Sequence, residues 1–150
     1  MKRIRVIFLN KKTAAAKATE KRKLLRKLLN APVSNVRFTP NRVSLDYLGY
    51  RISDAVLVKR ENHVAEWSRS RKQIFIDREI LGSDRKKSFR ALCIHEVIEK
   101  FLCEKFGLNA DKEAHVVATR KEKEYLEKIG GNWRSHEHIV YWDWHLLGEK

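Results

Sequence analysis

The 150-residue sequence predicts one α+β domain, in which a small mixed or antiparallel sheet packs on an antiparallel pair of long helices. The length fits a single domain and leaves little room for two. Short β-like runs separated by turn residues fill the stretch from about 33 to 80, and helical periodicity dominates from about 84 to 129. A basic strand and helix at about 1–30 precede this core, and an aromatic tail follows at 132–150.

The N-terminal thirty residues carry most of the net charge of +14, with eleven Lys or Arg residues and one acid. Alternating basic and apolar residues predict a strand at Arg3–Leu9, and good helix formers predict a helix over Thr13–Leu29. Such a helix can attract nucleic acid, or it can simply present a solvated face that keeps the protein soluble. For the first role the candidate residues are Lys21, Arg22, Lys23 and Lys27.

The middle of the chain predicts several short strands. They are expected at Val36–Phe38, Val43–Tyr50, Ala55–Val58, Val64–Trp67 and Ile74–Ile76, with Pro32, Pro40, Asn41 and Gly49 as punctuation. After them Ser83 or Asp84 can cap a long helix that ends at Gly107. Asn109 can cap a second helix that runs to about Ile129, so the two helices are joined by a short turn and lie antiparallel.

The helix pair holds the one constellation that could do chemistry. Within His95-Glu96-Val97-Ile98-Glu99, residues 95 and 99 are one turn apart on the same face. Counted from the turn near residue 108, Glu99 is level with His115, and His95 is level with Glu122. Two histidines and a glutamate are a ligand set for catalytic zinc, although iron or manganese also suits it. The metal would activate a water, and Glu96 would act as general base.

Two questions about these groups stay open at the level of sequence. Glu122 can orient the ring of His95 through a hydrogen bond without touching the metal, or it can be a fourth ligand. Alternatively, all of these groups are charges on solvent-facing helix surfaces, and the glutamates pair with Lys100, Arg120 or Lys123.

The first of two consecutive motifs is Cys93-Ile94-His95-Glu96-Val97-Ile98-Glu99, and the second is Glu113-Ala114-His115-x-x-Ala118-x-x-x-Glu122. The two motifs resemble those of the zincin-like metalloprotease-type proteins of archaea and phages. Ile74–Asp77 also resembles the strand that lies along the active-site cleft in zincins. The resemblance covers roughly residues 72–130. It implies a zincin-like fold, with His95, Glu99 and His115 as metal ligands and Glu96 as general base. A glutamate stands where the commoner motif has its second histidine.

The tail concentrates aromatic residues and histidines. Trp133, Tyr141, Trp142 and Trp144 are expected either to complete the core as a closing segment or to line a substrate groove beside the helices. His136 and His138 share a face only in a strand, where they could form a second metal site with His145; ordinary exposed histidines are the alternative.

Together these features predict a zinc-dependent hydrolase, a metallopeptidase acting on a peptide or protein; the alternative is a nucleic-acid-associated binding module with a structural or inactive metal site. Cys93 and Cys103 are expected to be reduced core residues of a cytoplasmic protein. No apolar run approaches the roughly 20 residues of a membrane span. The scarcity of Cys, Met and Gln beside abundant Lys, Arg and Glu is typical of thermophiles. The oligomeric state stays open.

Overall fold

A computed structural model describes residues 13–59, 63–69, 71–77, 80 and 85–148 of the chain. The expected strand at 3–9 and the two candidate caps at 83 and 84 lie outside these residues. The chain divides into two compact units, Met1–Ala31 and Pro32–Lys150.

The first unit contains the predicted basic helix, α2 (Ala14–Asn30). The hydroxyl of Thr13 caps it by accepting a hydrogen bond of 3.1 Å from the N–H of Ala16. Every Lys and Arg of the helix is exposed: Lys17, Lys21, Arg22, Lys23, Arg26 and Lys27. The helix therefore presents a dense set of cations, with Glu20 as the acid among them.

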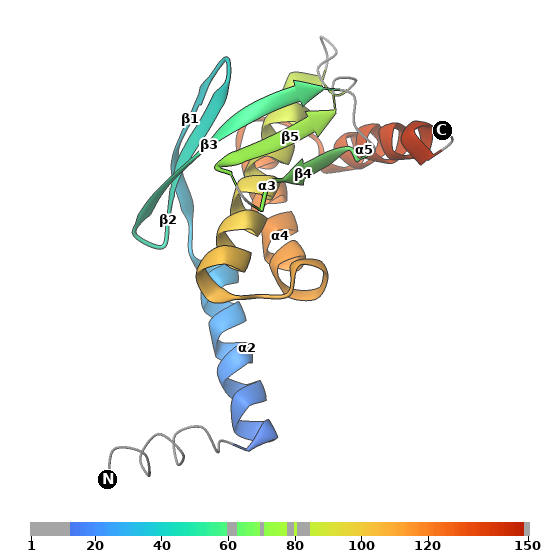
Figure 1. Cartoon of the computed structure of the whole chain (residues 1–150). Coiled ribbons are helices and arrows are strands. Elements are labelled where there is room, and N and C mark those ends of the chain that lie inside the picture. Colours follow the sequence, from blue (N-terminus) through green and yellow to red (C-terminus); the bar gives the residue numbers. More distant parts are fainter. Residues whose placement is uncertain (1–12, 60–62, 70, 78–79, 81–84, 149–150) are drawn as a thin grey trace. The chain divides into compact units, whose positions relative to one another are not determined.

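The second unit is built on a five-stranded mixed sheet with the spatial order β1-β2-β3-β5-β4 (Figure 1). Its strands are β1 (Val33–Thr39), β2 (Arg42–Tyr47), β3 (Tyr50–Lys59), β4 (Ala65–Trp67) and β5 (Gln73–Asp77). β3 and β5 pair in parallel, and the other neighbours pair antiparallel. The short strand β4 forms one edge, so β5 lies inside the sheet.

The single strand expected at 43–50 is wrong, because the structure divides this stretch between two strands. The run at 43–50 is interrupted by a two-residue turn at Leu48 and Gly49, and Tyr47 pairs with Tyr50 across it. Both turn residues have positive φ, 54° and 79°, as the tight hairpin turn that matches strand twist requires. Gly49 was the available signal; Leu48 in the left-handed region was not foreseeable, because side chains with a Cβ rarely adopt it.

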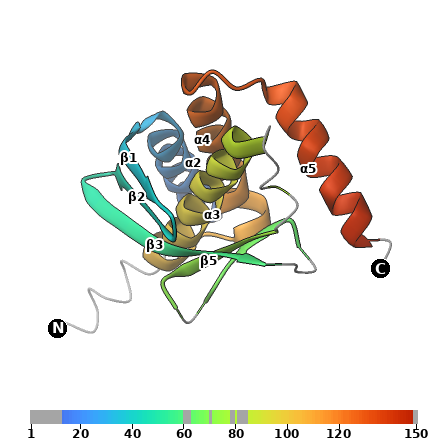
Figure 2. The same cartoon turned by 90° about the horizontal axis from the view of Figure 1, so that it is seen from above.

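Helix α3 (Lys86–Phe106) lies against one face of this sheet (Figures 1 and 2). The ring of Phe101 packs on Tyr47 of β2, with centroids 6.0 Å apart. Around this contact the core is formed by Val43, Leu45, Val56, Ile74, Ile76, Ile94, Val97, Ile98 and Leu102, all of them buried. The helix ends at Gly107, whose φ of 63° provides the left-handed residue that commonly closes a helix.

The second long helix begins with a wide turn, η3 (Ala110–Ala114), and continues as α4 (His115–Lys128). As predicted, Asn109 caps it: its side-chain oxygen accepts a hydrogen bond of 2.9 Å from the N–H of Lys112. The tail is a further helix, α5 (Trp133–Gly148). Among the described residues, no helix has both the length and the apolar character needed to cross a bilayer.

Candidate metal centre

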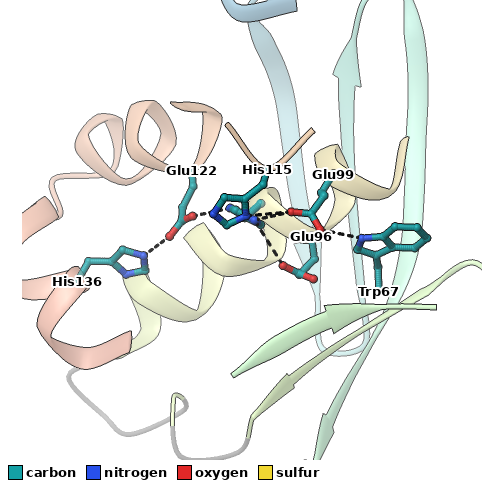
Figure 3. Close-up of polar contacts among 7 residues, drawn as sticks. Trp67, Glu96, Glu99, His115, Glu122 and His136 are labelled. Atoms are coloured by element: carbon teal, nitrogen blue, oxygen red, sulfur yellow. Dashed lines mark hydrogen bonds and ion pairs between the residues drawn. The ribbon is translucent and has the colours of Figure 1, made fainter. Parts of the chain in front are cut away.

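The turn between α3 and α4 brings four predicted side chains together. Because α4 returns antiparallel to α3, Glu99 meets His115 and His95 meets Glu122, as the counting from the turn predicts. The rings of His95 and His115 lie edge to face, with centroids 4.8 Å apart. The four groups therefore belong to one cluster that spans both helices (Figure 3).

Three side chains of this cluster converge on one point. One ligand atom from each of His95, Glu99 and His115 lies within 4.8 Å of the others. The Nε2 atom of His95 is 2.9 Å from Oε2 of Glu99, and Nδ1 of His115 is 3.2 Å from the same oxygen. Two imidazole nitrogens and one carboxylate oxygen form the donor set that divalent zinc prefers in sites that keep a position for water or substrate. The residues present therefore fit a metal.

Glu122 lies behind this cluster rather than in front of it. Its Oε1 atom is 2.7 Å from Nδ1 of His95, the ring nitrogen that faces away from Glu99. A carboxylate that accepts the Nδ1–H bond leaves the lone pair on Nε2, which then faces the point of convergence. The other oxygen of Glu122 bonds Nε2 of His136 on α5. Glu122 thus contacts the ring nitrogen of His95 that an orienting carboxylate would contact.

Burial and mutual charge shift the pKa values within the cluster. Without a metal ion, burial lowers the pKa of His95, but the hydrogen bonds to Glu122 and Glu99 outweigh it and raise the value to about 10. A metal at Nε2 would take the place of the proton on that nitrogen. The pKa of Glu99 lies below its usual range, since His95 and Trp67 stabilise the carboxylate more than burial destabilises it. Burial also raises the pKa of Glu122, but the hydrogen bonds from His136 and His95 and the charges of both rings outweigh it and lower the value.

Glu96 stands in a different environment from its neighbours. It is 6% exposed, and its Oε2 atom lies 3.8 Å from Nε2 of His95. Burial raises its pKa to about 8, because the attraction of His95 only partly offsets the loss of solvation and Glu99 repels the charge. A carboxyl group with a pKa near neutrality beside a ligand cluster is suited to accept and return a proton.

The alternative of solvent-facing charges applies to His115, whose side chain is 55% exposed, but not to the buried members of the cluster. His95, Glu96 and Glu122 are each 6% exposed. Lys100 bonds Glu104 at 2.7 Å and lies 3.7 Å from Asp54, away from the cluster.

Two contributors were missed at the level of sequence. Trp67 of the edge strand β4 donates its indole N–H to Oε1 of Glu99 at 3.0 Å. His136 is 2% exposed and contacts Glu122. Asn132 was a usable signal for the second, since its side chain accepts from the N–H of Ser135 at 2.9 Å and so starts the helix that carries His136.

The helical tail corrects the expectations placed on it. In a helix, positions two apart point in different directions, so His136 is buried while His138 and His145 are exposed. Within the described residues the one cluster suited to a metal is that of His95, Glu99 and His115, so the second metal site is wrong. The interpretation of all three as exposed histidines fails for His136 alone.

The strand beside the cluster is also corrected. β5, which contains the expected cleft strand, is interior, and β4 is the edge that reaches Glu99 through Trp67. Asp77 is buried at the end of β5, where its backbone N–H donates to the carbonyl of Val64.

Comparison with known proteins finds no match: no family model, no curated protein and no solved structure matches the chain. The geometry and chemistry of the cluster are therefore the basis on which a function can be assigned to this protein.

Proposed function

We propose that this protein is a metal-dependent hydrolase, a zinc peptidase with a zincin-like arrangement of an edge strand beside a helix that carries the ligands. The observation that carries the proposal is the convergence of His95, Glu99 and His115 next to the buried carboxyl group of Glu96. Of these groups His95 and Glu96 are buried, Glu99 is partly buried and His115 is exposed. A charged helix surface would not need to bury His95 and Glu96 side by side, because burial of ionisable groups is costly.

The metal would be held by Nε2 of His95, a carboxylate oxygen of Glu99 and Nδ1 of His115. When bound, zinc would lower the pKa of a coordinated water towards 7 and polarise a carbonyl group. Iron or manganese is compatible with the same donor set.

The chain's own groups then divide the work. Glu96 takes the proton of the attacking water on a carboxylate oxygen and returns it to the leaving amine. Glu122 holds the ring of His95 through Nδ1, and His136 holds Glu122 in turn. The indole of Trp67 holds Glu99 through its second oxygen. Such supporting hydrogen bonds keep ligands oriented and raise metal affinity.

The edge strand supports a peptide as the substrate. The backbone N–H of Asp77 donates to the carbonyl of Val64 at 2.7 Å, and the backbone N–H of Ser68 donates to the carbonyl of Gln73 at 3.0 Å. Because bonding directions alternate along an antiparallel strand, the backbone groups of Ala65 and Trp67 point away from β5. An extended polypeptide can pair with such an edge, and here it would pass beside the ligand cluster.

The first test is the metal content of the purified protein, measured by elemental mass spectrometry. We expect one zinc per chain, and loss of that zinc in both His95→Ala and His115→Ala. The matched control is His138→Ala, which removes an exposed histidine outside the cluster and leaves the metal in place. Wild-type protein that takes up no metal after reconstitution would overturn the proposal.

The second test separates chemistry from metal binding. Glu96→Gln should retain the zinc and lose peptide hydrolysis by about 10²- to 10⁴-fold, the usual contribution of a general acid–base group. Glu127→Gln, an exposed acid on α4, is the control and should cleave as wild type does. Full activity in Glu96→Gln would remove Glu96 from the mechanism.

Helix α2 favours a second function, binding of a nucleic acid duplex through its phosphates. Its six exposed cations include Lys21, Arg22, Lys23 and Lys27 within seven residues. Four phosphate contacts predict that duplex affinity falls about 100-fold between 50 and 200 mM salt.

Neutralising these four residues tests that second function. It should abolish most of the salt-dependent binding, whereas the same charge change in the second unit should not. A suitable control changes Arg71, Lys86, Lys112 and Lys128, which are also exposed. Equal loss in both variants would assign the affinity to net charge rather than to α2.

A further inference from the structure

The C-terminal helix exposes an unusual amount of apolar surface. His136, Asp143 and Leu147 form its buried side. The remaining large side chains are mostly in solvent: Tyr141 is 54% exposed, Trp142 56%, Trp144 61% and Leu146 49%. A contiguous exposed apolar patch of this kind is typical of ligand-binding grooves and of surfaces that bind other macromolecules.

Part of this surface is one wall of a cavity that opens on the ligand cluster. The cavity measures about 410 Å³, within the range of small-molecule and side-chain pockets. His95, Glu96 and His115 are among the polar residues that line it. Its other lining is largely apolar, from Val64, Leu92, Trp133, Val140, Tyr141 and Trp144.

The charged groups of the cavity are concentrated at the ligand cluster, with Glu137 of α5 as a further, exposed acid. Buried His136 also lines it, and its Nδ1 atom has no hydrogen-bond partner among the described residues. Thr119 and Glu122 also line the cavity, so polar and apolar residues each make up half of its lining. Apolar walls favour apolar side chains of a ligand, and the polar groups orient it.

We propose that this cavity is the specificity pocket of the enzyme and takes a large apolar side chain, aliphatic or aromatic, next to the bond that is cleaved. The inference rests on the proposed function, since it needs the metal centre to define that bond. Continuity of the cavity with His95, Glu96 and His115 identifies the occupant as part of the substrate, and the aromatic wall of α5 defines its chemistry. Trp133, Tyr141 and Trp144 are then specificity-determining residues.

Two neighbouring tryptophans make the inference testable. Trp144 lines the cavity, whereas Trp142, exposed to nearly the same extent on the same helix, does not. Replacing either by alanine removes the same side chain from solvent-exposed positions, so both variants should fold. Tyr141→Ala provides a second change within the wall.

The probes are the hydroxamates of glycine, leucine and phenylalanine, bound to zinc-loaded, full-length protein and measured by calorimetry. Each compound has the same metal-chelating group. The affinity of the glycine compound therefore measures binding to the metal alone, and the affinity of the leucine or phenylalanine compound divided by that of the glycine compound measures the contribution of the pocket. Burial of a leucine or phenylalanine side chain should raise affinity by about 10- to 100-fold over glycine. In Trp144→Ala and Tyr141→Ala this ratio should fall at least about fivefold, while Trp142→Ala keeps it.

The outcomes separate the two proposals. Equal affinity for all three hydroxamates, with zinc bound, would overturn the pocket and leave the metal centre intact. A ratio that falls equally in Trp142→Ala and Trp144→Ala would also overturn it, because the effect would then not come from the cavity. Failure of the glycine compound to bind zinc-loaded protein would overturn the metal centre and the pocket with it.

Discussion

Replacing Glu122 by glutamine should weaken zinc binding without abolishing it. The side chain keeps its size, and its buried position is unchanged, but a neutral amide oxygen replaces the carboxylate that lies 2.7 Å from Nδ1 of His95. A hydrogen bond to a charged group contributes about 1.5–3 kcal/mol, and an amide retains part of it. The remaining loss of about 1.4 kcal/mol corresponds to roughly a tenfold fall in zinc affinity, the lower end of what such supporting groups contribute.

The assay is competition with a chelator of known zinc affinity, at one pH and one ionic strength. Glu127→Gln on the same helix is exposed and serves as the matched control, with an affinity equal to that of wild type. A change of less than about twofold in Glu122→Gln would refute the orienting role assigned from its bond to His95. A loss as complete as that of His95→Ala would make Glu122 a ligand instead.

Three further predictions concern stability and reactivity. The pKa of Asp46 is lowered by hydrogen bonds from Asn35 and Arg51, so this group stabilises the fold above the usual aspartate pKa of about 3.9, and the contribution is lost as pH falls through the lowered value. Arg51→Met should therefore be less stable than wild type at pH 7 in urea unfolding, and a difference that did not shrink in acid would contradict the assignment. A Cβ on Gly131 would overlap Cδ1 of Leu126 and lie 3.0 Å from the carbonyl oxygen of that residue, so Gly131→Ala should lower the free energy of unfolding by about 1–3 kcal/mol; an unchanged denaturation midpoint would show that the loop relaxes freely. The thiol of Cys93 is fully buried and its pKa is raised by burial, so it should react with a disulfide reagent only after unfolding, and rapid labelling of the native protein at this residue would show that the core opens.

The helix pair and its cluster were accessible from sequence because every step there is local. Gly107 and Asn109 mark the end of one helix and the start of the next, and helical rise then fixes which residues are level. The level pairs His95 with Glu122 and Glu99 with His115 needed no knowledge of the sheet. Membership of the α+β class was accessible for the same reason, from the switch between strand-like and helical periodicity.

The contacts of Trp67 with Glu99 and of His136 with Glu122 were not accessible, because both join residues distant in sequence; Asn132 signalled only the start of the helix that carries His136. Trp67 reaches Glu99 only because β4 pairs on the outside of β5, an order that the run at 64–67 does not reveal. His136 needs a helical tail, yet the aromatic density of 132–150 gave no clear period. The large exposed tryptophans also run against the general rule that aromatic residues complete a core.

The wide turn η3 at the start of the second helix limits how this protein can change during evolution. Substitutions at its exposed positions, such as Asp111 and Lys112, leave the backbone path intact. An insertion or deletion between Gly107 and His115 would rotate His115 by about 100° relative to the turn, away from Glu99. In related genes this stretch should therefore vary in residue identity while keeping a constant length, and a change in that length would mark descendants that have lost the centre.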